Sequence, residues 1–351
     1  MFRMTQHRTL VFLLLLLTLP LSGCDLLGTD NEDSTLVTDG VYVANQGNFN
    51  DGNGSVTLYN PNTGTSTTAV ENLSSIVQSI ALRNDRLYLT ANSGGRLDVF
   101  DAGDQSQLQQ LTGLSGPRYL TFTDDETAFL TDQSFSGPST VQVLDEADAA
   151  PERTTSIEVP GTPEGLTHTD DRVYATLGGF SDTTLVAAIS TDDRMLTETI
   201  DVGCAPRYAV SDRQDEVFVL CSDTSEAVVL EGSTGDELTR LDLPSPSSTR
   251  GPGQPGFFAA DAEELYVVAS QDRLVRINTA ANEVGPTLGP FDGAPIGAVG
   301  YDTVREELYV GRVPGFTEEG SVTIHERGGT QTGSFQAGVA PTFIDFRRSE
   351  E

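Results

Sequence analysis

The chain has 351 residues, of which 52 are Asp or Glu and 20 are Arg, with no Lys, so its formal net charge is −32. Such an acidic surface repels nucleic acid and anionic membrane surfaces, which excludes both as binding partners. The acidic residues are scattered along the chain. This pattern favours adaptation of the whole surface, as in an extracytoplasmic protein of a salt-loving bacterium, over an acidic binding site.

Residues 1–23 have the pattern of a lipoprotein signal peptide. Arg3 and Arg8 precede an apolar run from Leu10 to Leu19, which is too short for an ordinary membrane span. The run is followed by Leu-Ser-Gly-Cys, which resembles the bacterial lipobox, where the Cys receives a diacylglycerol group and becomes the new N-terminus. We therefore expect a lipid anchor at Cys24. The alternative is a secreted protein with an early free Cys.

Residues 24–38 are predicted to form an acidic tether, because they are rich in Asp, Asn and Glu and have no apolar period. The protein is then expected in the cell envelope. An acidic tether resembles surface-export signals and favours the outer membrane or the cell surface. Asp25 favours the periplasmic face of the inner membrane under the sorting rule of some Gram-negative bacteria, so both locations stay open.

An internal repeat dominates residues 39–347. Each unit has a Gly/Pro entry, a short apolar strand, an acidic turn, a second strand with a central aromatic residue, a variable loop and two further strands. Four short antiparallel strands per repeat are typical of a β-propeller blade. The central aromatic residues are Tyr42, Tyr88, Phe129, Tyr174, Phe218, Tyr266 and Tyr309. Seven units predict an all-β fold, a seven-bladed propeller that forms one domain.

The ends of the repeat region predict how the ring closes. The first unit begins directly at its aromatic strand, residues 40–44, and lacks an entry strand. Residues 338–346 look like an entry strand with no unit after it. We therefore expect the C-terminal strand to complete blade 1, which leaves no open sheet edge. Residues 348–351 are predicted to be a short tail.

The loops between the second and third strands vary most in length. In a propeller these loops share one face with the entry loops, and we call it the long-loop face. Its long loops place a Phe among Gly, Ser and Asn, at Phe49, Phe135, Phe180 and Phe316. Long loops on a rigid scaffold often carry binding residues, so we predict that these Phe contact a ligand. The alternative is that each Phe folds back into a small core of its own loop.

A second group of candidate ligand-binding residues is predicted near the mouth of the central channel. Two copies of Pro-Arg-Tyr place Arg118 beside Tyr119 and Arg207 beside Tyr208. A guanidinium beside an aromatic ring suits a carboxylate, amide or phosphate of a ligand. The alternative is that these Arg residues tie neighbouring blades together through ion pairs.

Cys204 and Cys221 are predicted to form a disulfide. Cys204 opens one strand and Cys221 closes the next, and in an antiparallel hairpin these two ends meet. Disulfides persist outside the cytoplasm. The alternative is a pair of buried free thiols.

The sequence offers little catalytic chemistry. Apart from His7 in the signal peptide, the chain has only His168 and His325, which belong to different repeats and are expected to be structural. No Gly-x-Ser-x-Gly, His-Glu-x-x-His or paired-Cys motif occurs. Residues 50–54 have oxygen ligands at alternate positions but lack the bidentate Glu of a Ca²⁺ loop. We predict a protein that is not an enzyme and has no metal or cofactor.

The repeats resemble the YVTN or YncE-like seven-bladed propellers over nearly all of the chain after the tether. The opening, GVYVANQGNFNDGNGSVTLYNPNTG, is similar to the first blade of surface lipoproteins with the DUF5074 signature, where an Asn-Glu-Gly-Asn-Phe run precedes a small-residue loop. Asn45, Gly47, Asn48 and Phe49 match this run, and Gln46 replaces its Glu.

That family includes surface propellers that capture cobalamin and hand it to a TonB-dependent transporter. The resemblance therefore implies capture of a corrinoid or similar nutrient, with a TonB-dependent outer-membrane transporter as partner. Two other functions stay open, because a fold does not carry a function. A lactonase-like propeller enzyme should have a polar, metal-competent axial pocket, and a structural or adhesion module should bury the Phe residues within their loops.

Overall fold

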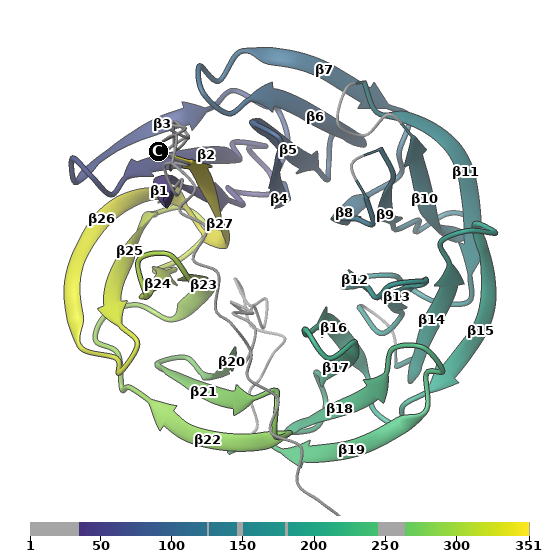
Figure 1. Cartoon of the computed structure of the whole chain (residues 1–351). Coiled ribbons are helices and arrows are strands. Elements are labelled where there is room, and N and C mark those ends of the chain that lie inside the picture. Colours follow the sequence, from purple (N-terminus) through teal and green to yellow (C-terminus); the bar gives the residue numbers. More distant parts are fainter. Residues whose placement is uncertain (1–34, 125, 146–149, 180–181, 245–263, 351) are drawn as a thin grey trace, which may run out of the picture. The chain divides into compact units, whose positions relative to one another are not determined.

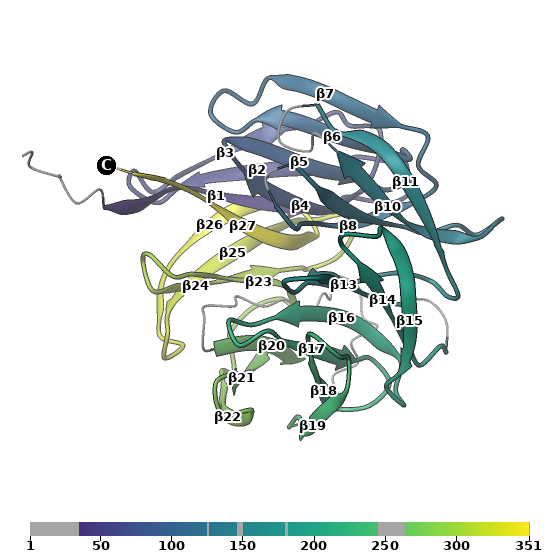
Figure 2. The ribbon, with the colours of Figure 1, turned by 45° about the vertical axis from the view of Figure 1, so that its right-hand side comes forward.

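Seven small antiparallel sheets form a ring in the computed structural model (Figure 1). The structure describes residues 35–124, 126–145, 150–179, 182–244 and 264–350. The seven-bladed propeller is therefore confirmed. In each blade the strands run from the centre of the ring outward, as β4 to β7 do in Figures 1 and 2. No helix among the described residues is long and apolar enough to cross a membrane.

The first four blades consist of strands β1 to β15 together with the C-terminal strand β27. Blade 1 consists of β27 (Pro341–Glu350), β1 (Leu36–Asn45), β2 (Ser55–Asn60) and β3 (Thr65–Val70). Blade 2 consists of β4 (Val77–Arg83), β5 (Arg86–Ala91), β6 (Arg96–Asp101) and β7 (Gln107–Thr112). Blade 3 consists of β8 (Pro117–Phe122), β9 (Ala128–Asp132), β10 (Ser139–Asp145) and β11 (Glu152–Val159). Blade 4 consists of β12 (Leu166–His168), β13 (Arg172–Thr176), β14 (Leu185–Ser190) and β15 (Met195–Asp201).

The last three blades follow the same plan. Blade 5 consists of β16 (Pro206–Ser211), β17 (Glu216–Cys221), β18 (Glu226–Glu231) and β19 (Glu237–Asp242). Blade 6 has three described strands, β20 (Glu264–Ser270), β21 (Arg273–Asn278) and β22 (Glu283–Leu288). Blade 7 consists of β23 (Ile296–Asp302), β24 (Glu307–Arg312), β25 (Glu319–Glu326) and β26 (Gln331–Val339).

Several sequence predictions fall outside the described residues. They are the signal peptide, the lipidation site at Cys24, nearly all of the tether, and the entry strand of blade 6 at residues 253–260.

The aromatic residue at the centre of each second strand is the core of the fold. All seven are 0–1% exposed. Tyr42, for example, packs with Val56 of its own blade and with Leu87 and Leu89 of blade 2. Large buried aromatic residues contribute strongly to a core, and their truncation to Ala typically costs about 3–5 kcal/mol. The repeat therefore marks the interfaces at which blades pack face to face.

Hydrogen bonds between innermost strands fix neighbouring blades to each other around the channel. Thr167 Oγ1 in blade 4 accepts the backbone N–H of Ser211 in blade 5 at 2.9 Å. At the equivalent place, Asp345 Oδ2 in blade 1 accepts the backbone N–H of Leu82 in blade 2 at 2.8 Å. Backbone N–H groups on the free edge of an inner strand are thus hydrogen-bonded by side chains of the preceding blade.

The C-terminal strand completes blade 1, as predicted. β27 pairs with β1 from Leu36 opposite Glu350 to Asn45 opposite Pro341. Arg347 strengthens this closure, because its Nε and Nη2 each lie 2.8 Å from a carboxylate oxygen of Asp39.

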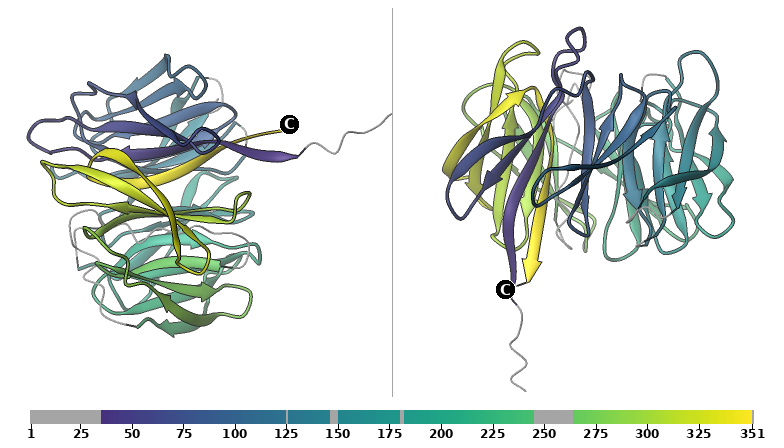
Figure 3. Two further views of the ribbon diagram at one scale, coloured as in Figure 1. Left: turned by 90° about the vertical axis from the view of Figure 1, so that its left-hand side faces the viewer. Right: turned by 90° about the horizontal axis from the view of Figure 1, so that it is seen from above.

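The two paired ends extend beyond the predicted propeller bounds of 39 and 347. Strand pairing starts at Leu36 and reaches Glu350, so part of the predicted tether and tail belongs to blade 1. The physical reason is main-chain hydrogen bonding, which tolerates the polar composition of both ends. These ends leave blade 1 on the face opposite the loop of residues 46–54 (Figure 3).

Candidate functional site

The loop that carries Phe49 is held in one shape by its own side chains. Asn53 Oδ1 accepts the backbone N–H of Asn48 at 2.6 Å, and Asn48 Oδ1 accepts that of Asn50 at 2.8 Å. Gly47 has φ +80°, and a β-carbon there would lie 2.5 Å from the backbone nitrogen of Gly54. The Asn and Gly residues of this loop are therefore needed for its conformation.

The same loop is clamped between two entry loops. The backbone N–H groups of Gln46 and Gly47 donate to the carbonyls of Ala340 and Val339, at 2.8 and 2.9 Å. On the other side, Gly54 N–H donates to Ser75 O at 2.9 Å. Phe49 is left 69% exposed on a fixed support.

The other predicted Phe contacts differ in exposure. Phe135 is 87% exposed, in a loop where Ser134 Oγ accepts the N–H of Gly137 at 3.0 Å. Phe316 is half-buried, and Phe180 lies outside the described residues. For Phe49 and Phe135 the structure contradicts the alternative that they form the core of their own loops.

Arg118 connects two blades. Its Nε donates to Glu164 Oε2 at 2.9 Å and its Nη2 donates to Oε1. Gln133 Nε2 donates to the same Oε2 at 2.9 Å. Arg118 is 6% exposed and Glu164 is fully buried. The alternative of a blade-connecting ion pair therefore describes Arg118, whose bidentate contact joins blade 3 to blade 4.

Arg207, Tyr119 and Tyr208 extend this cluster into blade 5. Arg207 Nη2 lies 3.9 Å from Glu164 Oε1, and its guanidinium carbon lies 5.4 Å from the ring centre of Tyr208. The two Tyr rings meet edge to face at 6.0 Å. Burial raises the pKa of both phenols, so both stay neutral hydrogen-bonding groups. Both Tyr side chains are buried, so they belong to the channel wall and not to the exposed rim.

A cavity of about 340 Å³ lies within the ring, along the innermost strands. Its described lining combines aromatic side chains, those of Tyr119, Tyr208, Tyr301 and Phe343, with polar and charged ones, among them Thr167 and Arg348. One carboxylate, Asp345, also lines it. Burial raises the pKa of Asp345 to about 6, although the N–H groups of Leu82 and Phe346 both donate to it. Sequence reasoning missed this residue, whose only signal is a lone acid within an apolar strand.

Four blades brace their entry loops with the residue three positions after the central aromatic residue. In blade 1, Asn45 Oδ1 accepts the N–H of Gly338 at 3.0 Å. In blade 3, Asp132 Oδ1 accepts the N–H groups of Ser115 and Gly116 at 2.9 and 2.8 Å. Both side chains are buried and their remaining polar atoms are also hydrogen-bonded.

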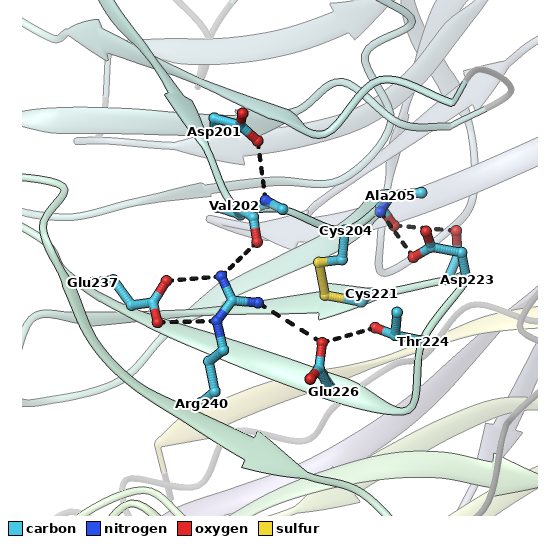
Figure 4. Close-up of a disulfide and its surroundings, with 12 residues drawn as sticks. Asp201, Val202, Cys204, Ala205, Cys221, Asp223, Thr224, Glu226, Glu237 and Arg240 are labelled. Atoms are coloured by element: carbon cyan, nitrogen blue, oxygen red, sulfur yellow. Dashed lines mark hydrogen bonds and ion pairs between the residues drawn. A yellow bond between two sulfur atoms is a disulfide. The ribbon is translucent and has the colours of Figure 1, made fainter.

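In blade 5 the brace is covalent. Cys221 occupies the bracing position and is bonded to Cys204 of the entry loop, with their Cα atoms 5.7 Å apart (Figure 4). The predicted disulfide is therefore present, and the alternative of two free thiols is wrong. Beside it, Arg240 Nη2 donates to Val202 O at 2.7 Å, which holds the start of the same entry loop (Figure 4).

In blade 7 the brace is Arg312, which sequence reasoning also missed. Its Nη2 donates to the carbonyl oxygens of Phe291 and Asp292 in the entry loop, at 2.8 and 2.9 Å. An alignment of the repeats could have identified it, because a charged residue stands here at a position where blades 2, 4 and 6 have Ala or Leu.

Both His residues are hydrogen-bonded within the propeller. His168 Nδ1 lies 3.0 Å from Thr121 Oγ1. Both ring nitrogens of His325 have partners, Gly329 O at 3.1 Å and Thr323 Oγ1 at 2.8 Å. Among the described residues, no group of three or more His, Cys, Asp or Glu side chains is arranged to hold a metal ion. In residues 50–54, Asn53 Oδ1 is already occupied by a hydrogen bond within the loop.

Solved structures similar to this chain share its fold at low identity. A functionally unknown protein from Desulfotomaculum acetoxidans aligns with a TM-score of 0.68 and 13% identity, over 88% of this chain and 99% of that chain. A periplasmic gluconolactonase from Pseudomonas aeruginosa aligns with a TM-score of 0.66 and 16% identity, over 87% and 99%. A chain of a mitotic checkpoint complex aligns with a TM-score of 0.59 and 12% identity, over 85% and 95%. Such diverse neighbours show the fold alone.

Comparison with curated proteins finds no match. A family profile does match. It covers residues 39–326 and is described as a domain of unknown function, DUF5074. These residues include the first unit with its Phe49 loop, the five complete repeats that follow and most of the seventh, so the resemblance seen in the first blade extends along the propeller. The chain therefore belongs to the DUF5074 family.

Proposed function

We propose that this propeller is a non-enzymatic, lipid-anchored protein of the cell envelope that binds a ligand or a protein partner on its long-loop face. The observation that carries the proposal is the exposure of Phe49 and Phe135, at 69% and 87%, on loops of that face. Loops on a rigid scaffold are where binding residues are most often found. The lipid anchor at Cys24 and the location in the outer membrane or at the cell surface are parts of the same proposal.

The Phe49 loop is suited to binding because it is ordered without a ligand. Its hydrogen bonds to the entry loops of blades 1 and 2 hold Phe49 away from its own loop. An aromatic side chain held on a rigid support loses little conformational entropy when it binds. Phe49 therefore fits the part of a contact residue, whereas Arg118 and its partner Glu164 fit that of a structural connection between blades 3 and 4.

We propose a corrinoid or a similar nutrient as the ligand, passed on to a TonB-dependent transporter. The support is membership of the DUF5074 family together with the exposed side chains of Phe49 and Phe135, which suit a large ring with apolar edges. A lactonase activity is the competing proposal. The exposed rim favours binding, because a lactonase needs a polar pocket and not exposed Phe side chains.

Isothermal titration of residues 25–351, which contain the whole propeller, with cobalamin in high salt tests the proposal. We expect binding that a Phe49→Ala/Phe135→Ala double variant loses. Leu108→Ala is the matched control, because Leu108 is 48% exposed on the outer strand β7, away from the loops. Since these side chains are exposed, all three proteins should have the same unfolding midpoint.

Two results would redirect the proposal. Absence of heat and of a spectral change in the corrin would reject the corrinoid and leave a protein partner as the next ligand to test. Hydrolysis of gluconolactones at enzymatic rates by the same preparation would reject the non-enzymatic part.

A further inference from the structure

A pocket with a basic lining lies on the face of the propeller opposite the long-loop face. Its volume is about 320 Å³, and it is formed by the end of β4, the turn to β5 and the end of β27. β4 starts at the long-loop face, where Val77 N–H donates to Gln46 O at 3.2 Å, and ends at Arg83. Three of the seven described residues that line the pocket are Arg (Arg83, Arg347 and Arg348), although the whole chain has only 20 Arg among 351 residues. The pocket therefore concentrates positive charge on a protein that is otherwise strongly acidic.

Two of these Arg side chains each lie over a buried aromatic ring. The guanidinium carbon of Arg83 lies 5.5 Å from the ring centre of Phe122, and that of Arg348 lies 5.6 Å from the ring centre of Phe346. Both Phe side chains are buried. The attraction between a cation and a ring favours this position, and a guanidinium that lies over a ring can still donate N–H groups from its edge. Both Arg side chains are therefore partly ordered before a ligand arrives, which lowers the entropic cost of binding.

The guanidinium of Arg348 has hydrogen-bond donors without an acceptor. Among the described residues it makes no hydrogen bond, and its ion pair with Asp302 measures 3.6 Å from Nη2 to Oδ1, which is longer than a hydrogen bond. That oxygen already accepts the hydroxyl of Thr38 at 2.9 Å and the N–H of Val304 at 3.0 Å. The Arg348 side chain is 31% exposed, so its N–H groups can be reached from the pocket.

Arg347 is already paired and forms a fixed part of the wall. Its Nε and Nη2 donate to Asp39, and its Nη1 donates to Ala102 O at 2.7 Å. The acid that lines the pocket, Asp85, is exposed, so water and salt screen its charge. The excess positive charge of the pocket therefore belongs to the other two Arg residues.

We propose that this pocket binds a small soluble molecule through a phosphate group held between Arg83 and Arg348. Guanidinium groups supply N–H donors in a planar geometry that fits phosphate oxygens. Ligand pockets have volumes of roughly 300–1,000 Å³, so this one has room for a small phosphorylated molecule and not only for a bare ion. In concentrated salt the Debye length is only about 3 Å, so the two local charges outweigh the negative charge of the rest of the surface. This site lies on the other face from the one that carries the proposed function.

Calorimetric titration of residues 25–351 with glycerol 3-phosphate tests the site, with glycerol as the uncharged control. We expect only the phosphate ester to bind, and an Arg83→Gln/Arg348→Gln double variant to bind it about tenfold or more weakly. Arg213→Gln is the matched control, because Arg213 is exposed in the equivalent turn of blade 5, on the same face and outside the pocket. Phe49→Ala/Phe135→Ala should bind the ester normally, which separates this site from the proposed function. Absence of binding, or equal binding by the Arg double variant, would overturn the site.

Crystals of the unsubstituted protein give a measurement that depends on no variant. Arsenate resembles phosphate, and its arsenic atom scatters anomalously. After a soak in sodium arsenate we expect an anomalous peak within hydrogen-bonding distance of both Arg83 and Arg348. Arsenic peaks elsewhere with none in this pocket would contradict the proposal.

A phosphate group can also come from a lipid headgroup, and sedimentation with phosphatidylglycerol vesicles distinguishes the two sources. Because the protein as a whole is strongly acidic, we expect it to stay in solution. Sedimentation that the Arg83→Gln/Arg348→Gln variant loses would keep the phosphate site and overturn the soluble source.

Discussion

At the scale of single residues, one position shows how the repeat tolerates different chemistry. This is the bracing position, three residues after the central aromatic residue of the second strand. It carries an amide side chain in blade 1, a carboxylate in blade 3, a disulfide-bonded Cys in blade 5 and a guanidinium in blade 7. Each holds the entry loop of its own blade. In these four blades different side chains thus make the same kind of contact with the entry loop, whereas blades 2, 4 and 6 have Ala or Leu at this position.

Asp345 gives a pH-dependent prediction at the same scale. Its pKa is about 6 in the folded protein against an ordinary value of 3.8, so the unfolded chain releases the proton first as the pH rises. Stability is therefore lost between about pH 4 and pH 6, by up to roughly 3 kcal/mol. Asp345→Asn retains an acceptor for the Leu82 N–H and removes this loss.

Urea denaturation in high salt at pH 4.5 and pH 7.5 measures this effect. We expect Asp345→Asn to gain stability relative to the unsubstituted protein between the two pH values. A constant difference between the two proteins would show that the carboxyl titrates normally.

At the scale of strands and loops, the sequence predicted most of the fold because each strand carries its own signal. The aromatic centres and Gly/Pro entries recur with every blade, and all seven aromatic residues are buried as a propeller core requires. The sequence left open whether Phe49 is exposed or packs within its own loop, because its position depends on hydrogen bonds of the loop to Ala340 and Ser75, which are distant in sequence. Arg118 likewise depends on Glu164, 46 residues away.

The disulfide of blade 5 makes a prediction for its hairpin. Cys204 and Cys221 are 17 residues apart in the sequence, so the bond closes a loop and restricts the conformations of the unfolded chain. A Cys204→Ala/Cys221→Ala double variant should lose roughly 3 kcal/mol of unfolding free energy on the chain-entropy model. Chemical denaturation of the variant, compared with the oxidised and the reduced parent, checks this. The reduced parent should resemble the variant, and equal stability of all three would mean that the brace is dispensable.

At the scale of the whole molecule, the ring depends on its last strand. β27 is the inner strand of blade 1 and also supplies Asp345 to blade 2 and Ile344 to the core shared with blade 7. Without it, β1 would present an open edge toward the channel.

A chain truncated after Ala340 should therefore fail to form a stable monomer, whereas a chain truncated after Arg347 should keep the ring. Truncation after Arg347 removes the outermost pairs with β1 and the contacts of Arg348 with Asp302 and with the Phe346 ring, and it retains the Arg347–Asp39 ion pair. Size-exclusion chromatography and cooperative unfolding distinguish the two. A cooperative monomer from the longer truncation would show that six complete blades close without the strand.

The place where the chain enters blade 1 bears on how a lipid-anchored propeller would present its loops. The start of β1 lies at the end of blade 1 opposite the loop of residues 46–54 (Figure 3). If Cys24 carries the proposed lipid, Phe49 and Phe135 would face the medium, away from the membrane that anchors the protein. To present a captured nutrient to a transporter in that same membrane, the propeller must turn over. The residues between Cys24 and Leu36 reach at most about 40 Å when fully extended. The ten-residue strand β1 alone spans about 30 Å. Capture and delivery would then need two orientations of one molecule, and the tether would be only slightly longer than the propeller edge around which the chain must pass.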